Sequence, residues 1–438
     1  MTDTSAETQL TRSTMLLFGI GSFGTGVYLT VPSVLLLFFM TDVLGMQPAL
    51  AGIAVFVPRV YDVILDPIMG RISDRTRSRL GRRRPWLLGG AIASGALVIV
   101  LFSPPMIEDQ QVLFWYVMIA YALSATSYTV FAVPYLAMPA EMTRDPETRT
   151  TLMAYRMGFA MAGIMAGSAL TPWLVDVFGG GRIGFERMSW CIAAISSAAM
   201  LTAFFGTRGA ADDHDPNALH AGIFDSLRTV ASNRRFRSLG LVYFIQLTGL
   251  GCFNAAVAYF VIHALGRGES AIAVLFACVL CGSMVSMPLW IIAGRRLGKQ
   301  GAYVAAAATI VIATSGFWLT SSDPPWTQIL VLGALLGIGF GGAQMLPFSI
   351  VGDIIQQTAA GSAGTYTGVW TAIEKAGLAA GPLIVGLLLQ ISGFREGAAA
   401  GSQSAGAIEG VRAAISLFPA IFVALSIPAL LSRSREKT

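Results

Sequence analysis

Charged side chains are scarce in this 438-residue sequence. Aspartate, glutamate, lysine and arginine make up only 12% of it, against about 25% in soluble domains. Hydrophobic residues make up 55%, and the mean hydropathy is +0.67. A membrane-spanning helix needs about 20 mostly apolar residues, and such runs follow one another along the chain with short links. The composition excludes a soluble domain and predicts an all-α integral membrane protein.

The sequence also lacks the motifs of most enzymes. No GxxxxGK[ST] motif occurs, so the chain carries no ATP-driven motor of its own. Only one histidine, His263, falls in an apolar run, too few for the metal or nucleophile site of an intramembrane hydrolase. Two GxGxxG matches, GIGSFG and GIGFGG, lie inside apolar runs with no preceding strand. We expect no enzyme, no cofactor and no structural metal.

Cysteine is equally sparse. Cys191, Cys252, Cys278 and Cys281 all lie in apolar runs, and the last two form a CxxC pair. A zinc or redox role would need more ligands or an aqueous setting. Small apolar core residues are the favoured interpretation.

The distribution of basic residues predicts topology. The start MTDTSAETQLTR lacks the basic head and cleavage site of a signal peptide, so we expect the first apolar run to insert and remain. The net charge of +5 does not predict nucleic-acid binding, because the bases are segregated by loop. With both termini in the cytoplasm, only a few arginines lie outside, namely Arg182, Arg187, Arg267, Arg395 and Arg412. This asymmetry predicts a protein of the inner membrane with cytoplasmic termini.

Twelve apolar runs predict twelve transmembrane helices in two six-helix bundles. They cover residues 13–41, 48–73, 86–103, 111–140, 151–176, 187–207, 239–265, 270–293, 301–321, 326–353, 363–392 and 411–432. The predicted domains are residues 1–207, a cytoplasmic linker at 208–238, and residues 239–438. The basic link GRISDRTRSRLGRRRP of the first half has a weak counterpart, GRRLGKQG, in the second, as expected of two parallel repeats.

The linker sequence is amphipathic. Ile223, Phe224, Leu227, Val230 and Phe236 recur near helical spacing, opposite several arginines. Such a segment would lie on the inner membrane face and couple the two halves. A solvated linker helix without a coupling role explains the pattern equally well.

One apolar run carries three charged residues. Arg59, Asp62 and Asp66 lie within the second predicted span, where ionisable groups are costly and therefore candidates for function. Asp62 and Asp66 are four residues apart and share a helical face. Pro67 leaves the carbonyl of Val63 without its helical donor. Two carboxylates and a free carbonyl suit a monovalent cation, whether a proton or sodium.

Alternatives remain for each of these charges. Arg59 could neutralise one acid in the empty carrier, or the group could be a static pair that braces the bundle. Arg156 could anchor a substrate or balance an acid. Lys375 could pair with Asp62 or Asp66 across the two halves and form a gate. Glu374 lies about 100° from Lys375 around the helix, so the two cannot face one cavity squarely.

The stretch RVYDVILDPIMGRISDRTRSRLGRRRPW resembles the glycoside–pentoside–hexuronide:cation symporters of the major facilitator superfamily. The similarity extends to GIGSFGTG, FFMTDVLG, SYTVFAVPY, YRMGF and TAIEKAG. It implies a cation-coupling site of Asp62, Asp66 and Thr129. We predict a substrate and charge network of Arg59, Arg156, Lys375, Tyr128, Thr371, Trp370, Gly26 and Ala132, and a cytoplasmic gate loop with Asp74, Arg75, Gly81, Arg82 and Arg83.

Departures from the family pattern shape the functional prediction. Leu65 stands where sugar carriers of the family have an asparagine that helps to hold sodium, which favours a proton. Gly26 and Ala132 stand where they have sugar-gripping aspartates, and Leu136 where they have a tryptophan, so we expect a wider, less polar cavity. We predict a monomeric symporter, surrounded by membrane lipid, for a glycoside or other small organic solute. A proton-coupled transporter or exporter of an amphipathic substrate such as a lysolipid, or a non-transporting receptor, is the alternative.

Overall fold

The computed structural model describes residues 10–143, 145–208, 230, 232–321, 324–358, 363–399 and 401–435. In these ranges every regular element is a helix. The first half contains α1 (Arg12–Phe38), the π-helix η1 (Phe39–Val43), α2 (Pro48–Arg75), α3 (Arg84–Phe102), α4 (Gln110–Met142), α5 (Pro146–Val177) and α6 (Gly181–Gly206). The second contains α8 (Arg234–Tyr259), η2 (Phe260–Ala264), α9 (Glu269–Trp318), α10 (Trp326–Thr358), α11 (Ala363–Ile391), α12 (Ala405–Ile415) and α13 (Leu417–Arg435).

The predicted twelve crossings are present in the described residues. Eleven helices are long and apolar enough to cross a membrane, with α12 and α13 together forming the last of them. One of the eleven, α9, is 50 residues long and is broken at Gly298, where φ is +73° and ψ is 158°. Its two parts correspond to the eighth and ninth predicted spans, and the shorter part, 299–318, still extends about 30 Å.

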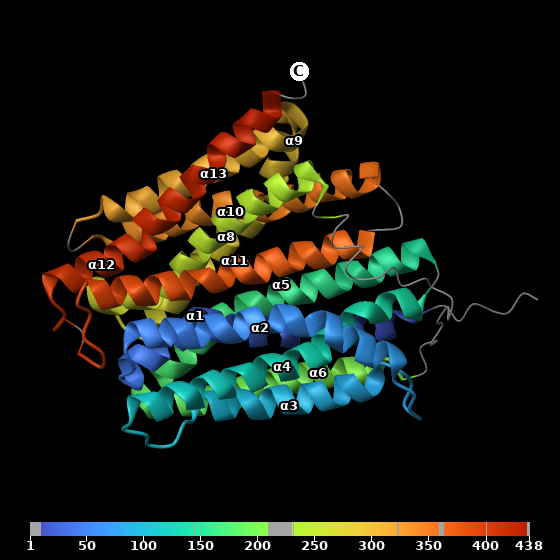
Figure 1. Ribbon diagram of the computed structural model, residues 1–438, viewed down its shortest axis with the longest axis horizontal. Helices are drawn as coiled ribbons and strands as arrows, with labels where there is room; N and C mark the ends of the chain where they lie inside the picture. Colours follow the sequence, from blue (N-terminus) through green and yellow to red (C-terminus); the bar gives the residue numbers. More distant parts are fainter. Residues whose placement is uncertain are drawn as a thin grey trace, which may run out of the picture.

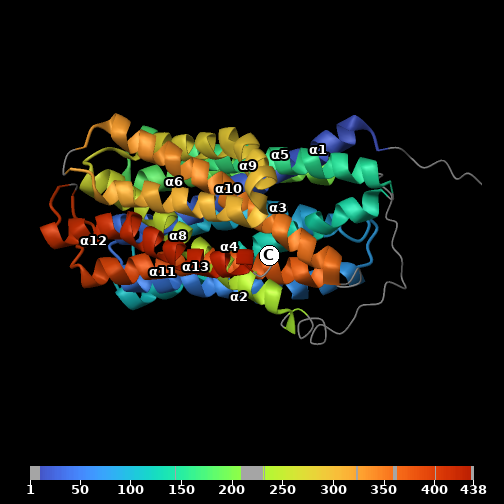
Figure 2. The ribbon, with the colours of Figure 1, turned by 90° about the horizontal axis from the view of Figure 1, so that it is seen from above.

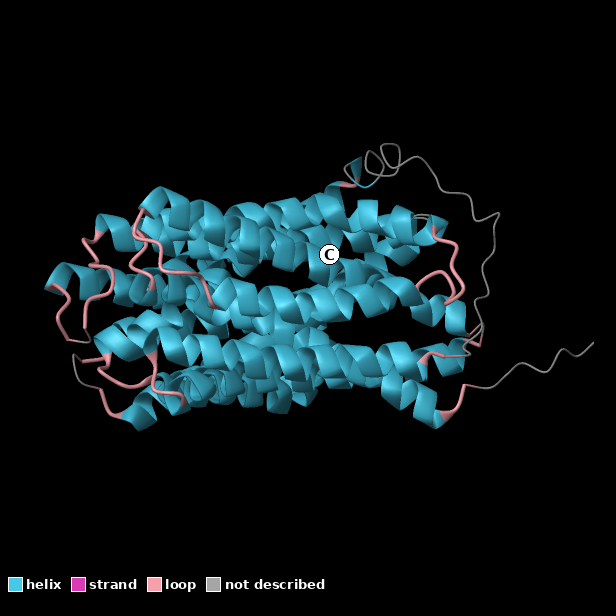
Figure 3. Cartoon of the chain, turned by 90° about the horizontal axis from the view of Figure 1, so that it is seen from below, coloured by secondary structure: helices cyan, strands magenta, loops and turns pink. Residues whose placement is uncertain are grey.

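The helices form two bundles that lie side by side. Figure 1 shows α1–α6 in the lower part of the view and α8–α13 in the upper part, and Figure 2 shows the same long helices from above. The halves meet where α2 packs on α11, α5 on α9 and α1 on α8. Loops gather at the two ends of the helices (Figure 3). We call the end with the arginine-rich loop 76–83 the basic end, and the end with η1 and η2 the Asp42 end.

The two halves repeat the same opening unit. α1 runs into η1 and α8 runs into η2. Each π-helix closes with the same hydrogen bond, Leu44 N to Phe39 O at 3.0 Å and Leu265 N to Phe260 O at 2.9 Å. A left-handed glycine follows in both halves, at Gly45 and Gly266. This correspondence supports the internal repeat that the sequence suggested only weakly.

The predicted linker 208–238 lies mostly outside the described residues. Its last part differs from the expectation, because α8 begins at Arg234 and not near residue 239. The side chain of Asn233 accepts a hydrogen bond from Phe236 N and caps the helix. The polar RRFR segment is therefore the first turn of a membrane helix.

Candidate functional site

Two aspartates, a lysine and a threonine meet near the middle of the helices. Lys375 of α11 places its Nζ 2.8 Å from Asp62 Oδ2 and 2.6 Å from Asp66 Oδ2, both on α2. Thr129 of α4 donates to Asp62 Oδ1 and lies 3.3 Å from Asp66 Oδ1. Because α2 and α4 belong to one half and α11 to the other, this cluster bridges the two bundles. We call these four residues the acid–lysine cluster.

Burial in the acid–lysine cluster is uneven. The side chain of Asp62 is 5% exposed, that of Lys375 18% and that of Asp66 28%. Asp66 lies one helical turn closer to the basic end than Asp62. The acid nearer the basic end is therefore the more accessible of the two. The expectation that Asp62 and Asp66 share one face is met, since one ammonium group contacts both.

Arg59 does not pair with the acids. Its Nε donates to the hydroxyl of Tyr121 at 2.5 Å, and its terminal nitrogen donates to Ser33 Oγ at 3.0 Å. The guanidinium also lies over the Tyr121 ring, 5.8 Å from its centroid. The base that contacts both carboxylates is Lys375, while Arg59 interacts with Asp62 electrostatically without forming an ion pair.

Three further predicted residues lie around this centre. Tyr128 stacks on Tyr28 with ring centroids 4.9 Å apart. Arg156 of α5 is partly buried, interacts electrostatically with Tyr128, and has a buried Nε with no hydrogen-bond partner among the described residues. Thr371 is partly exposed one turn from Lys375 on α11 and bonds its own helix at Thr367 O. Tyr128 also interacts electrostatically with Asp62 and Asp66, so these polar groups gather around the acid–lysine cluster.

Two neighbours on α11 belong to the core of the second half. Trp370 is 1% exposed and stacks on Tyr243 with centroids 4.4 Å apart. Glu374 also faces Tyr243. The expected orientation of Glu374 away from Lys375 agrees with the structure. Trp370, however, is a packing residue in this conformation, which differs from its predicted place in the substrate network.

Gly26 does not widen a cavity. A Cβ at this position would lie 2.5 Å from Ala160 O and 2.8 Å from Ile164 N, because α1 and α5 are in backbone contact there. Ala132 is buried as well, at 8% exposure. Leu136, on nearly the same face of α4 as Thr129, is 49% exposed. Of the three departures from the sugar-binding pattern, only Leu136 presents an apolar surface.

The basic loop is held by acids of its own half. Arg83 lies 2.5 Å from Asp74 and 2.8 Å from Glu141, and Arg82 also pairs with Glu141. Gly81 adopts φ +92°, and Arg75 is exposed. Asp74 belongs to the predicted gate loop, whereas Glu141 was missed. Its only signal was a lone acid at the end of the fourth predicted span.

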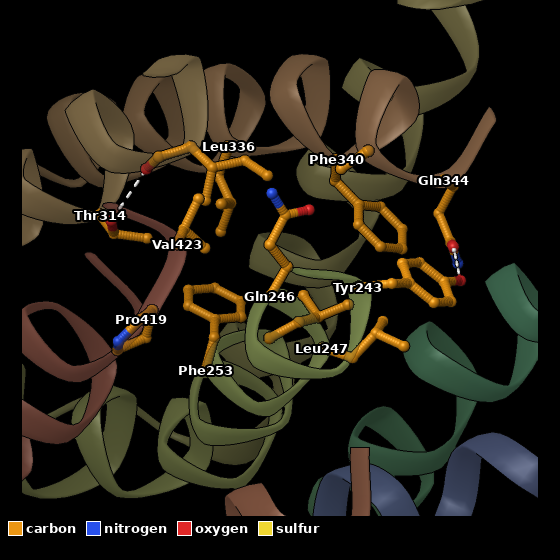
Figure 4. A pocket seen from close by; sticks show the side chains of 13 residues that line it. Tyr243, Gln246, Leu247, Phe253, Thr314, Leu336, Phe340, Gln344, Pro419 and Val423 are labelled. Atoms are coloured by element: carbon orange, nitrogen blue, oxygen red, sulfur yellow. Dashed lines mark hydrogen bonds between the residues drawn. The ribbon is translucent and has the colours of Figure 1, made fainter. Parts of the chain in front are cut away.

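Polar residues within the second half satisfy one another. Gln246 accepts from Tyr303 at 2.6 Å and donates to Ser426 at 2.8 Å. Tyr243 donates to Gln344 at 3.1 Å, and both line a small cavity inside this half (Figure 4). These hydrogen bonds join neighbouring helices of the second half.

The halves are joined at the Asp42 end by contacts that the sequence did not predict. Thr41 and Tyr259 hydrogen-bond at 2.7 Å, Asp42 pairs with His263, and Gly397 N donates to Thr41 O at 3.2 Å. Nearby, Gly386 of α11 lies against the backbone of Pro48 and Gly52 of α2. This end is closed.

Comparisons with known proteins agree with this architecture. Residues 17–432 match the model of the family described as MFS/sugar transport protein. The inner membrane symporter YicJ of Escherichia coli is 28% identical over 93% of this chain and 88% of its own. The putative glycoside/cation symporter YagG of the same organism is 29% identical over 87% of this chain and 83% of its own. A bacterial homologue of the lysosomal transporter Spinster, solved in an inward-facing, unoccupied conformation, shares the fold with a TM-score of 0.76 at 15% identity, over 97% of this chain and 96% of its own.

Proposed function

Because the chain belongs to the MFS/sugar transport protein family, as a glycoside–pentoside–hexuronide:cation symporter, we propose that the acid–lysine cluster couples cation entry to solute uptake. The protein is a cation-coupled membrane transporter and not an enzyme. The observation that carries the proposal is the double ion pair of Lys375 with Asp62 and Asp66 across the two halves. The proposal concerns the coupling ion, the substrate class and the roles of the individual residues.

Competition for the carboxylates provides the coupling. Two ionised carboxylates and one ammonium group carry a net charge of −1, so the acid–lysine cluster can accept one further positive charge. A cation bound to Asp62 or Asp66 displaces Lys375, because both need the same oxygen atoms. Loss of this bridge removes an attraction between α2 and α11. The two halves can then rock about the centre and expose it to the other side.

A proton is the coupling ion that this site favours. Sodium, a hard cation, binds best among several oxygen ligands. The oxygen ligands near the acids are the Thr129 hydroxyl, the carboxylates themselves and the Val63 carbonyl that Pro67 leaves free, and Leu65 adds no oxygen. A proton needs a single carboxylate oxygen. Protonation of Asp66, the more exposed acid, would be enough to release one of the two lysine contacts.

A glycoside is the proposed substrate class. The name of YagG specifies a glycoside/cation symporter, and Arg156, Tyr128 and Thr371 offer polar groups beside the acid–lysine cluster. An amphipathic solute is the alternative, favoured by the apolar surface of Leu136. Hydroxyl-rich ligands are selected by convergent hydrogen bonds, so the two classes separate readily in a binding assay.

The orientation follows from the basic loop. We propose that the basic end, with Arg75, Arg82 and Arg83, faces the cytoplasm of the inner membrane. The structure then corresponds to a carrier closed to the outside and accessible from the inside.

Proteoliposomes test this proposal. Purified protein is first screened by thermal shift against sugars, glycosides and lysolipids, each in sodium and in potassium at two pH values. Uptake of the stabilising solute is then measured under an imposed proton gradient or sodium gradient. We expect accumulation with the proton gradient alone. Asp62→Asn and Asp66→Asn should abolish accumulation, and Lys375→Ala should reduce it at least tenfold.

Lys299→Ala is the matched control. Lys299 forms an exposed pair with Asp353 at 2.6 Å, far from the acid–lysine cluster, and its loss should leave uptake unchanged. Accumulation against a gradient by either Asp→Asn variant would refute the coupling assignment. Accumulation driven by sodium alone would refute the proton and retain the site.

A further inference from the structure

The internal repeat brings two titratable residues together at the Asp42 end. The segments FFMTDVLG and YFVIHALG end α1–η1 and α8–η2 with the same π-helix and the same left-handed glycine. When the two segments are aligned, Asp42 and His263 occupy equivalent positions of the two halves. They form an ion pair through Asp42 Oδ1 and His263 Nε2. Equivalent positions that touch must lie at the pseudo-symmetry axis that relates the halves.

This pair is enclosed. The side chain of His263 is 1% exposed and that of Asp42 is 9% exposed. The imidazole packs edge-on against Phe394, with centroids 5.2 Å apart, and lies 6.4 Å from the ring of Phe38. These aromatic walls exclude water from the pair when the end is closed.

Other titratable and charged groups lie on the segments around the pair. Asp42 also accepts from Thr41, whose hydroxyl contacts Tyr259, and Tyr259 is the one further titratable group that interacts with this carboxylate among the described residues. On the neighbouring α12 the charged residues are Glu409 and Arg412, and Arg412 is held by the carbonyls of Trp318 and Thr320. On α9, Glu269 lies beside Gly180. Arg395 and Glu396 lie between Phe394, which packs on His263, and Gly397, and Arg267 follows His263 by one turn with its guanidinium over Trp326. Among the described residues, His263 is the ion-pair partner of Asp42.

From this placement we infer that Asp42 and His263 form a second proton-binding site, which holds one proton when the Asp42 end is closed and releases it when that end opens. With one shared proton, the pair is neutral overall, either as carboxylate with imidazolium or as carboxylic acid with imidazole. Without that proton, a net negative charge would remain buried among aromatic rings, which costs several kcal/mol. The site is separate from the acid–lysine cluster, and the inference rests on the proposed function only in requiring that this end opens.

Opening of the Asp42 end favours release of this proton. Once η1 and η2 separate, both side chains meet water, where an imidazole loses its proton near pH 6.5 and a carboxyl group near pH 3.9. Above about pH 6.5 the open form thus binds fewer protons than the closed form. Because the closed form binds up to one proton more than the open form, the closed-to-open ratio falls by up to about tenfold for each unit by which the pH rises. Rising pH should open this end.

Distances between spin labels measure the ratio directly. Met106 in the first half and Leu319 in the second lie at this end and are 85% and 80% exposed. Full-length protein free of native cysteine is labelled at Met106→Cys and Leu319→Cys in lipid nanodiscs. Distance distributions are then recorded at pH 6.5 and pH 8.0. We expect the closed-to-open ratio to fall by about threefold to fifteenfold over this interval.

Two variants separate titration from simple packing. The double variant Asp42→Asn/His263→Gln keeps hydrogen-bonding side chains at both positions but cannot titrate, so the pH response should shrink to less than about twofold. Asp42→Asn should invert the response, because low pH would then bury an unpaired imidazolium. Inversion needs a folded protein, so it guards against a result from misfolding.

The acid–lysine cluster is the internal control. In the Asp62→Asn/Asp66→Asn background the pH response should persist. Its disappearance there would assign the proton to the acid–lysine cluster and overturn this inference without touching the proposed function. A wild-type ratio that does not change with pH, or a response that survives in Asp42→Asn/His263→Gln, would also overturn it.

Discussion

A single methyl group should force the closed end apart. Gly386 of α11 approaches α2 so closely that a Cβ there would lie 2.3 Å from Pro48 O and 3.2 Å from Gly52 Cα. Both contacts are with backbone atoms of the opposite half, so no rotamer change can relieve them. Gly386→Ala adds no charge and removes no hydrogen bond. It therefore tests closure alone, independently of the coupling residues.

The distances set the magnitude. An ordinary contact of Cβ with a neighbouring heavy atom begins near 3.4 Å, so α2 and α11 would have to separate by about 1 Å. Overpacking of this kind costs about 1–3 kcal/mol. The cost falls on the closed form and disappears once the halves have moved apart at this end. At 1.4 kcal/mol for each factor of ten, the closed-to-open ratio should fall by about 5-fold to 150-fold.

The assay uses the Met106 and Leu319 spin labels at a fixed pH of 6.5. We expect Gly386→Ala to increase the population with the longer distance by at least fivefold. Gly368→Ala lies on the same helix, where a Cβ meets nothing within 4 Å, and should reproduce the wild-type distribution. If Gly386→Ala folds and also gives the wild-type distribution, then contact between α2 and α11 does not hold this end closed.

Two further substitutions address stability, measured as the melting temperature in detergent. Glu141→Gln breaks the buried ion pairs with Arg82 and Arg83 and should lower the free energy of unfolding by about 3–5 kcal/mol. Lys299→Ala removes an exposed ion pair and should lower it by at most about 1 kcal/mol. Equal melting temperatures for the two variants would contradict this. Gly26→Ala places a Cβ 2.5 Å from Ala160 O and should lower the free energy of unfolding by about 1–3 kcal/mol. Gly158→Ala, whose Cβ meets nothing within 4 Å, is its control. An unchanged melting temperature for Gly26→Ala would show that α1 and α5 can move apart.

The membrane fold could be predicted almost entirely from local pattern. Runs of about 20 apolar residues leave no other structure, because backbone groups in lipid must be satisfied within a helix. The twelve expected crossings are confirmed, and the structure differs from the prediction only in where individual helices begin and end. The break in α9 is at Gly298, and α8 starts at Arg234. Both depend on local capping and turn geometry, which hydropathy does not report.

Part of the candidate site was also predictable. Asp62 and Asp66 stood out because a charge in an apolar run is costly, and their spacing put them on one face. Lys375 stood out for the same reason. Which base would pair with the acids did not follow from spacing. Arg59 is a helical turn from Asp62 in the sequence, yet it bonds Tyr121 and Ser33, whereas Lys375 reaches both acids from the other half.

Contacts between distant segments were decided by tertiary structure. Nothing local in the sequence places Glu141 beside Arg83, or Gly26 against the backbone of α5. The pair of Asp42 and His263 arises because two repeats meet about an axis, which makes equivalent residues neighbours across 221 positions of sequence. Hydropathy and helical period fix what each segment is, since both act within a few turns. Which side chains share a proton or an ion pair depends on how the two bundles pack, and that is set by the whole chain.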